Sequence, residues 1–305
     1  MIYLDFFKAL VYTAVFSLLA TPLDFKLATA IGAIDIPKDS RRMHSMPIPR
    51  TGGISIFAAF AVFGFIFCRD IAPELTCLLM GAIFTVILGI ADDAFCLSAK
   101  TKLTVQVVAA LITVSGILFL YGGSGVILST VAVLWVLIFT NAHNFIDGLD
   151  GLCAGVSITE AVALSVIFLL NGDTSLGILA ATVGGACIGF FPYNGKKARI
   201  FMGDTGSTFL GFSLGTISLV FLLRHMSITA FISICLIFFV PLSDILFAVS
   251  RRLYQRKSIF SPDRHHIHHM LADSTLGHRG ASLVLRLVSL VSSIFGVLVI
   301  SFELR

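Results

Sequence analysis

Two adjacent aspartates, Asp92 and Asp93, end a long apolar segment of this sequence and precede Lys100 and Lys102. If that segment crosses a bilayer, an aspartate at its centre would cost roughly 2.5–3.5 kcal/mol, so the pair must lie at the mouth of a helix. Adjacent carboxylates repel each other and raise one pKa unless a cation offsets them, which suits metal binding or proton abstraction. The two lysines are candidate phosphate contacts. A plain charged helix end is the alternative interpretation.

A second acidic group holds Asp147 and Asp150, three residues apart and without a basic residue between them. This spacing lets the two acids share a helical face or line one turn. Asp-Gly turns are common between helices, but a turn does not need the amide side chains of Asn141 and Asn144 beside it. Carboxylate and amide oxygens suit Mg²⁺. The segment is therefore a candidate metal site, with a plain turn as the alternative.

A further acid, Asp204, stands at the start of another apolar segment, next to Gly203 and close to Gly206 and Ser207. Glycines at a helix start leave backbone N–H groups exposed, and these groups together with the helix dipole favour an anion such as phosphate. The pattern predicts an anion cradle beside Asp204. A simple N-cap role for Asp204 is the alternative.

Four histidines concentrate in one polar segment near the end of the chain, Asp263-Arg264-His265-His266-Ile267-His268-His269. Four histidines would suit zinc, but neither cysteine nor HExxH spacing accompanies them, so zinc is not favoured. A histidine and arginine cluster that faces phosphates fits better. Because Arg251, Arg252, Arg256 and Lys257 precede the segment, binding of anionic lipid headgroups is the alternative.

Two acids lie inside apolar segments, Glu160 and Asp244. Intramembrane acids are functional by default because burying them is costly. Asp244 lies one or two helical turns before Arg251 and Arg252, so an ion pair with these arginines is an open interpretation. Neither acid is assigned a catalytic role.

The elements that must position these side chains are membrane helices. Hydrophobic residues make up 57% of the 305 residues and charged residues only 12%, too little polar surface for a water-soluble particle of this size. Windows of about 18–20 apolar residues, each long enough to cross a bilayer as a helix, recur along the chain. We expect an all-α, polytopic membrane protein with a single domain over residues 1–305 and about ten spans: 6–23, 51–68, 75–91, 103–121, 126–142, 151–170, 176–193, 205–223, 228–250 and 281–301.

Basic residues identify the expected inner face. If ten helices alternate, five connections on one side hold sixteen of the 21 lysines and arginines. The positive-inside rule then predicts both termini outside and five loops in the cytoplasm. The same loops collect ten of the 17 acids and seven of the eight histidines, which that rule does not explain. The cytoplasmic face is therefore the expected working face.

Five motifs in order resemble one known family, the polyprenyl-phosphate N-acetylhexosamine-1-phosphate transferases of glycosyltransferase family 4. The resemblance covers nearly the whole chain. Within the family, the Asp-Arg-x-His-Ile-His-His and Pro-Arg-x-Gly-Gly forms of the motifs resemble the WecA/TagO-like branch more than the related phospho-MurNAc-pentapeptide transferase branch, MraY. The motifs are His44-Ser-Met-Pro-Ile-Pro-Arg50-Thr-Gly52-Gly53, Asp92-Asp93 with Lys102-Leu-Thr-Val-Gln106, Asn141-Ala-His-Asn144-Phe-Ile-Asp147-Gly-Leu-Asp150-Gly, Phe201-Met-Gly-Asp204-Thr-Gly-Ser207 and His266-Ile-His268-His269.

The resemblance implies a role for each motif. Asp204 would be the principal ligand of Mg²⁺, for which Mn²⁺ could substitute, and Asp147 would assist. Asp92 and Asp93 would deprotonate or hold the polyprenyl phosphate. The remaining roles implied are metal and nucleotide binding by Asn144, Asp147 and Asp150, uridine contact by Asn194 and Phe201, and phosphate or sugar contact by Arg264, His266, His268 and His269.

The resemblance also implies substrates and a compartment. We expect UDP-GlcNAc or another UDP-N-acetylhexosamine as donor and undecaprenyl phosphate as acceptor, giving the lipid diphosphate sugar and UMP in an early membrane step of cell wall, lipopolysaccharide or teichoic acid synthesis. The enzyme would sit among the lipids of a bacterial inner membrane, without nucleic acid, and a homodimer is left open. So is the choice between direct attack and a covalent intermediate. A transporter or flippase and a membrane scaffold are competing hypotheses.

Overall fold

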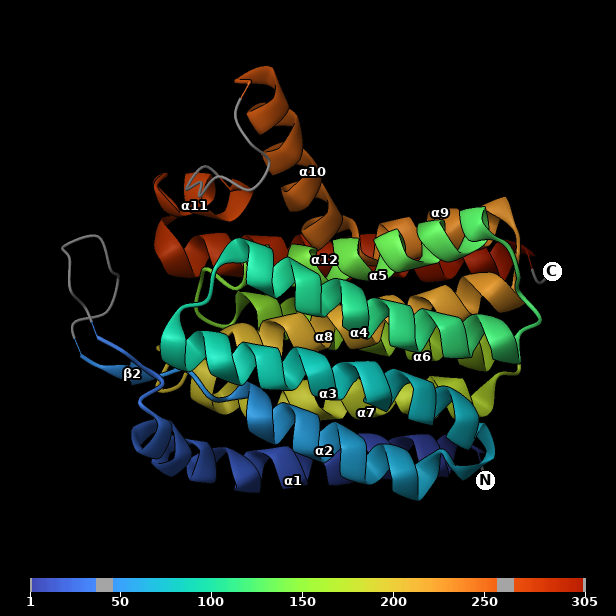
Figure 1. The fold of residues 1–305 in the computed structure, drawn as a ribbon, viewed down its shortest axis with the longest axis horizontal. Coiled ribbons are helices and arrows are strands. Elements are labelled where there is room, and N and C mark those ends of the chain that lie inside the picture. Colours follow the sequence, from blue (N-terminus) through green and yellow to red (C-terminus); the bar gives the residue numbers. More distant parts are fainter. Residues whose placement is uncertain (1, 37–45, 257–265, 304–305) are drawn as a thin grey trace.

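A computed structural model describes residues 2–36, 46–256 and 266–303 of the chain. Within these ranges the protein is almost entirely helical, which confirms the all-α prediction (Figure 1). The helices are α1 (Ile2–Ile31), α2 (Gly53–Phe67), the 3₁₀ turn η1 (Arg69–Ile71), α3 (Ala72–Phe95), α4 (Ala99–Leu120), α5 (Val126–Ile146), α6 (Leu152–Leu170), α7 (Thr174–Asn194), α8 (Gly203–Arg224), α9 (Ile228–Ile237), α10 (Phe239–Tyr254), α11 (Ile267–Ala272) and α12 (Gly277–Glu303).

The helices match the expected spans with two exceptions. Among the described residues, eight helices are long and apolar enough to cross a membrane, or nine if the bent pair of α9 and α10 counts as one span. The predicted span 51–68 forms the shorter helix α2, of 15 residues. The prediction of one continuous span over 228–250 is wrong, because an 84° bend separates α9 from α10. The count of ten is thus not confirmed.

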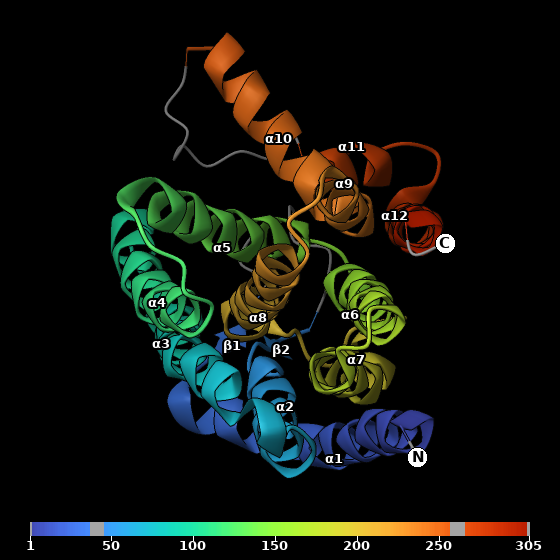
Figure 2. The same cartoon turned by 90° about the vertical axis from the view of Figure 1, so that its right-hand side faces the viewer.

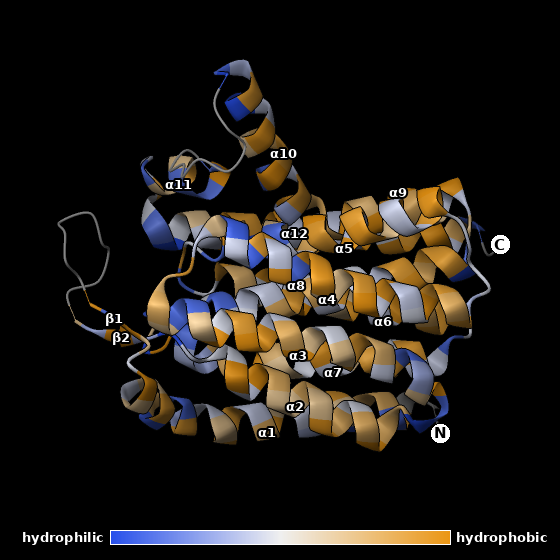
Figure 3. Ribbon diagram, in the orientation of Figure 1, coloured by the Kyte–Doolittle hydropathy of each residue, from blue (hydrophilic) through white to orange (hydrophobic). Residues whose placement is uncertain are grey.

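The two ends of the helix bundle differ in chemistry. Both termini lie at one end, and the loops that carry the acidic motifs lie with α11 at the other (Figure 1). Hydrophilic segments gather at this second end, and apolar residues dominate the middle of the bundle (Figure 3). This arrangement agrees with termini opposite the motif loops, although the side of the membrane stays a prediction.

Helix α8 occupies the centre of the bundle and brings Asp204 with it (Figure 2). Its small residues allow backbones to approach closely, as is typical of helices in lipid. A Cβ on Gly53 of α2 would lie 2.1 Å from the backbone nitrogen of Gly206, and one on Gly211 would lie 2.3 Å from the carbonyl oxygen of Phe139. Close packing against several helices therefore fixes the position of the α8 N-terminus.

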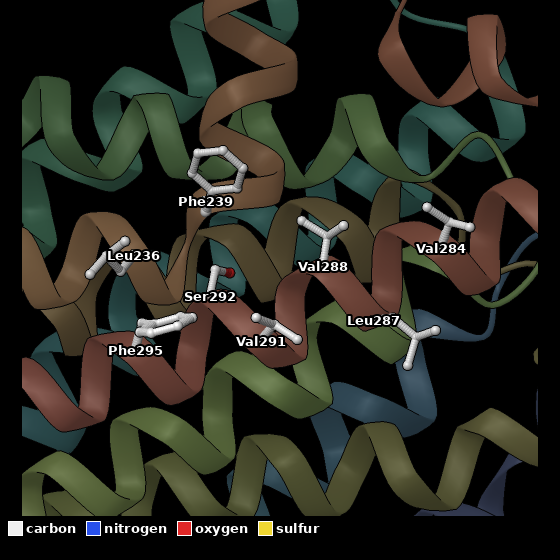
Figure 4. A pocket seen from close by; sticks show the side chains of 8 residues that line it. All are labelled: Leu236, Phe239, Val284, Leu287, Val288, Val291, Ser292 and Phe295. Atoms are coloured by element: carbon white, nitrogen blue, oxygen red, sulfur yellow. The ribbon is translucent and has the colours of Figure 1, made fainter.

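Helix α10 departs from the bundle, whereas α9 packs on α12 (Figures 1 and 2). An apolar groove of about 470 Å³ lies at the bend between α9, α10 and α12, with Leu236, Phe239 and Phe295 among its lining residues (Figure 4). Its walls carry several half-exposed apolar side chains, such as Phe239 at 47%. The groove has the character of a lipid-facing surface and lacks the charged groups of a reaction centre.

Candidate active site

Asp93 caps the central helix from a different helix. Its carboxylate accepts hydrogen bonds from the backbone nitrogens of Asp204 (3.0 Å) and Thr205 (3.1 Å) and from the Thr205 hydroxyl (2.7 Å). The first N–H groups of α8 have no partner within the helix, so a buried carboxylate stabilises them. The last turn of α3 is thereby tied to the start of α8.

A glycine is required where these two helices meet. Gly203 has φ +69°, and a Cβ there would lie 2.1 Å from the Arg50 carbonyl oxygen and 2.4 Å from Asp93 Oδ2. The Arg50 Nε atom lies 3.7 Å from Asp93 Oδ1 and offsets part of the negative charge. Glycine avoids both the left-handed strain and the clash.

Lys102 joins the other aspartate of the pair to Asp204. Its Nζ atom lies 3.1 Å from Asp92 Oδ2 and 2.7 Å from Asp204 Oδ2. Asp92 also accepts a bond of 2.7 Å from the Leu97 backbone nitrogen, which holds the carboxylate at the turn between α3 and α4. One cation between two carboxylates relieves their repulsion. The predicted residues Asp92, Lys102 and Asp204 are thus brought together.

Asn144 extends this cluster from the C-terminal end of α5. Its Nδ2 atom donates to Asp204 Oδ2 (3.3 Å), and its Oδ1 atom accepts from the Ser207 hydroxyl (3.1 Å). Around Asp204 the described residues therefore offer carboxylate, amide and hydroxyl oxygens. Such a donor set fits a hard cation such as Mg²⁺, with Asp204 and Asn144 as candidate ligands.

Asp147 and Asp150 follow α5 but differ in surroundings. Burial, together with the nearby charge of Asp204, raises the pKa of Asp147 well above its usual value. Such a group would ionise readily only if a cation were close. Asp150 Oδ2 accepts from the Ala198 backbone nitrogen (3.0 Å) and thus ties the loop after α5 to the loop before α8.

The two predicted uridine contacts lie near the start of α8: Asn194 is the last residue of α7, and Phe201 lies in the connection between α7 and α8. Asn194 is buried, accepts from the Gly151 backbone nitrogen (3.0 Å) and donates to the Ile200 carbonyl (3.0 Å). Phe201 bonds through its backbone to the Pro49 carbonyl (2.8 Å) and the Gly52 nitrogen (3.1 Å). Pro49 belongs to β2 (Ile48–Pro49), which pairs antiparallel with β1 (Ile34–Asp35). Asn194 and Phe201 therefore join loops at this end, and their contact with uridine stays a prediction.

Three histidines of the last motif, His266, His268 and His269, form a second cluster beside the acidic loop. His268 is buried and packs over Gly148, where a Cβ would lie 2.4 Å from its Nε2 atom. His266 is also buried, and its Nδ1 atom lies 2.8 Å from Asp244 Oδ2. Burial and the neighbouring His268 and His266 lower the pKa of His269 to about 4. The predicted contact Arg264 lies outside the described residues.

Two acids left without a role by the sequence have histidine partners. Asp244 pairs with His266, and the fully buried Glu160 lies 2.7 Å from Nε2 of His143, between α6 and α5. In the sequence, both residues could be recognised as functional candidates only because each is an acid within an apolar segment. Their partners are 22 and 17 residues away, too far for sequence spacing to identify.

Comparison with known proteins agrees with the resemblance in the motifs. Residues 75–222 match the family model described as glycosyl transferase family 4. A probable undecaprenyl-phosphate N-acetylglucosaminyl 1-phosphate transferase of Bacillus subtilis is 37% identical over 289 residues, 91% of this chain and 80% of the relative.

Two further relatives extend this likeness. An undecaprenyl-phosphate alpha-N-acetylglucosaminyl 1-phosphate transferase of Escherichia coli is 30% identical over 96% of this chain and 83% of the relative. A decaprenyl-phosphate N-acetylglucosaminephosphotransferase of Mycobacterium leprae is 33% identical over 90% of this chain and 78% of the relative. The fold, the clustered motifs and these relatives together establish that this chain belongs to glycosyl transferase family 4.

Proposed function

We propose that this protein transfers N-acetylglucosamine-1-phosphate from UDP-GlcNAc to undecaprenyl phosphate, with Mg²⁺, at the cytoplasmic face of a bacterial inner membrane. The observation that carries the proposal is the cluster of Asp92, Lys102, Asn144 and Asp204 at one end of a membrane bundle. A lipid phosphate and a soluble nucleotide can meet at such a boundary. The names of the relatives support the sugar and the acceptor class.

The proposed reaction exchanges one phosphoanhydride bond for another and leaves the bond between the sugar and its phosphate intact. An oxygen of the acceptor phosphate attacks the phosphorus that carries the sugar, a new P–O bond forms, the bond to UMP breaks, and UMP leaves. Phosphoryl transfer needs in-line positioning and stabilisation of charge more than covalent help from the protein. A diphosphate-bound Mg²⁺ would supply much of that stabilisation.

The residues divide this work by their positions. Asp204 and Asn144, with Asp147, would hold the metal. Lys102 would take up phosphate charge once the substrates separate it from a carboxylate. Asp92 lies at a helix mouth where a bilayer-anchored phosphate can bring its headgroup, so it would hold or deprotonate the acceptor.

Purified protein in detergent, given labelled UDP-GlcNAc, undecaprenyl phosphate and Mg²⁺, tests the proposal. We expect a labelled lipid and free UMP in equal amounts, loss of both with a chelator, and recovery with Mg²⁺ or Mn²⁺. If the protein used UDP-MurNAc-pentapeptide and not UDP-GlcNAc as donor, it would belong to the phospho-MurNAc-pentapeptide transferase branch. Absence of any lipid product from either donor would refute the transferase proposal.

A transporter remains a weaker candidate for this fold. Transporter sites usually lie near the bilayer midplane on broken helices. The α9–α10 bend is such a break, but the clustered acids lie at the bundle end. Uptake of substrate into sealed vesicles without chemical change would support the transporter and contradict the enzyme.

A further inference from the structure

Asp244 lies on α10, the helix that leaves the bundle, yet it is only 2% exposed. One of its oxygens lies 2.8 Å from His266 Nδ1, and the other accepts the Ile267 backbone N–H at 2.7 Å. Both oxygens thus face the first residues of the histidine segment. The carboxylate links α10 to the start of α11.

This contact decides which nitrogen of His266 carries a proton. An ionised carboxylate only accepts hydrogen bonds, so Nδ1 must donate. A carboxylate or carbonyl on one ring nitrogen fixes the tautomer and orientation of the imidazole and leaves the other nitrogen for chemistry. In His266 that other nitrogen is Nε2.

His266 is held next to the acidic motif as well. Its ring packs against Phe145 of α5 with centroids 5.0 Å apart, and against His268 with centroids 5.5 Å apart. His268 in turn packs over Gly148, between Asp147 and Asp150. A shift of the Asp244 side chain would therefore move the histidines relative to the carboxylates.

We propose that Asp244 is a positioning residue for the transfer reaction, which holds His266 as the Nδ1–H tautomer so that Nε2 meets the phosphates. This inference rests on the proposed function. In this role Asp244 would touch no substrate and would act through His266. Its other histidine neighbour, His268, lies with Nδ1 3.7 Å from Asp244 Oδ1, too far for a hydrogen bond.

A metal site is the competing explanation, since Asp244, His266 and His268 offer ligand atoms within 4.8 Å of one another. Both nitrogens of His268 are buried without a hydrogen-bond partner, which would suit a ligand. However, a metal on Nδ1 of His266 requires that nitrogen to be deprotonated. Its distance of 2.8 Å to the carboxylate instead fits a hydrogen bond.

The kinetic test uses Asp244→Asn, His266→Gln and the double variant, with the exposed Asp273→Asn as a matched control for the same chemical change. An asparagine can present an N–H to Nδ1 and thereby select the wrong tautomer. We expect kcat to fall roughly 10–100-fold in Asp244→Asn with UDP-GlcNAc affinity nearly unchanged, the range seen when a partner behind a functional histidine is lost. Asp273→Asn should match the wild type.

The double variant separates positioning from general structural damage. If Asp244 acts only through His266, the double variant should lose no more activity than His266→Gln alone. Losses that multiply would overturn the proposal. So would a melting temperature of Asp244→Asn far below that of Asp273→Asn, or stoichiometric zinc in the purified wild type.

A spectroscopic arm does not depend on the substrate. Nitrogen-15 labelling of histidine should give, for wild-type His266 at about pH 8, a protonated Nδ1 and an unprotonated Nε2, and Asp244→Asn should reverse the two. An unchanged His266 tautomer in the variant would refute the inference even if the enzyme is active. If neither donor is turned over, the proposed function is refuted. The His266 tautomer in wild type and Asp244→Asn then shows by itself whether Asp244 sets the protonation of His266.

Discussion

The carboxylate cluster and the histidine cluster lie at the same end of the molecule but are held in different ways. Asp93 makes three hydrogen bonds to the start of α8, and close glycine contacts lock that helix among its neighbours. The histidines instead follow α10, which leaves the bundle after an 84° bend, and their described polar link to it is Asp244.

This difference indicates a division between a fixed and an adjustable half of the site. Metal and diphosphate chemistry depends on preorganised charges, so the carboxylates benefit from a rigid, close-packed base. The histidine half has ring packing on Phe145 and Gly148, and its described polar link is one carboxylate on α10, a helix with fewer packing partners than α8. Changes in the first half should therefore cost more than changes in the second.

The largest effect is expected from Asp204→Asn. A neutral amide is a much poorer ligand for a hard cation, so nearly all turnover should be lost even at saturating Mg²⁺. Initial rates across a Mg²⁺ titration, with Asp273→Asn as the control, would measure this. Near-normal rates at high Mg²⁺ would remove Asp204 from the metal site, and zinc should not restore activity.

Asp92→Asn and Phe201→Ala should affect different substrates. If Asp92 is a positioned base, its loss should slow transfer by roughly 10²–10⁴-fold while nucleotide binding is spared. Phe201→Ala should weaken UDP-sugar binding by about 1–3 kcal/mol through lost aromatic packing. Calorimetric binding of UDP-GlcNAc beside initial rates tests both, and an equal loss of nucleotide affinity in the two variants would contradict this division.

Gly203→Ala tests how rigid the base of the carboxylate half is. The new methyl group would clash with the Arg50 carbonyl and Asp93, so the melting temperature and the activity should both fall, with a cost of about 1–3 kcal/mol. Gly122→Ala is the matched control, because Gly122 has φ +67° but open space around it. Equal destabilisation of the two would show that backbone strain alone, and not the junction, matters.

The smallest effect is expected from Glu160→Gln. Nδ1 of His143 lies 3.0 Å from the Phe139 carbonyl and must donate, so Nε2 can accept from a neutral Glu160. A glutamine N–H can replace that donor, and the loss of stability should stay below about 1 kcal/mol. Glu160→Ala should cost about 1–3 kcal/mol because it leaves a buried polar group without a partner. Thermal unfolding in detergent measures both effects. An equal fall in the melting temperature of Glu160→Gln and Glu160→Ala would indicate that Glu160 and His143 form an ionised pair instead.

The order of these effects sharpens the comparison between the two halves. If Asp244→Asn destabilised the protein as much as Gly203→Ala, the histidine half would be as firmly built as the carboxylate half. If Asp244→Asn lowered kcat strongly but the melting temperature only slightly, the result would support the interpretation of the histidine half as adjustable.

The sequence by itself determined the class of the protein and most of its candidate site. Long apolar windows predict helices because lipid offers no partners for backbone polar groups, and that rule depends only on local composition. The acids at helix ends were identified for the same reason, since charge is costly within the bilayer. Asp92, Lys102, Asn144 and Asp204 do converge as their positions at one face predicted.

Only the tertiary structure decided how neighbouring residues divide their work. Asp92 and Asp93 are adjacent, but successive helical residues point about 100° apart, so one meets Lys102 and the other caps α8. Hydropathy measures the length of an apolar segment and not its direction, so the bend in 228–250 was not predicted. The partners of Asp244 and Glu160 come from other helices, and helix packing alone brings each acid to its histidine.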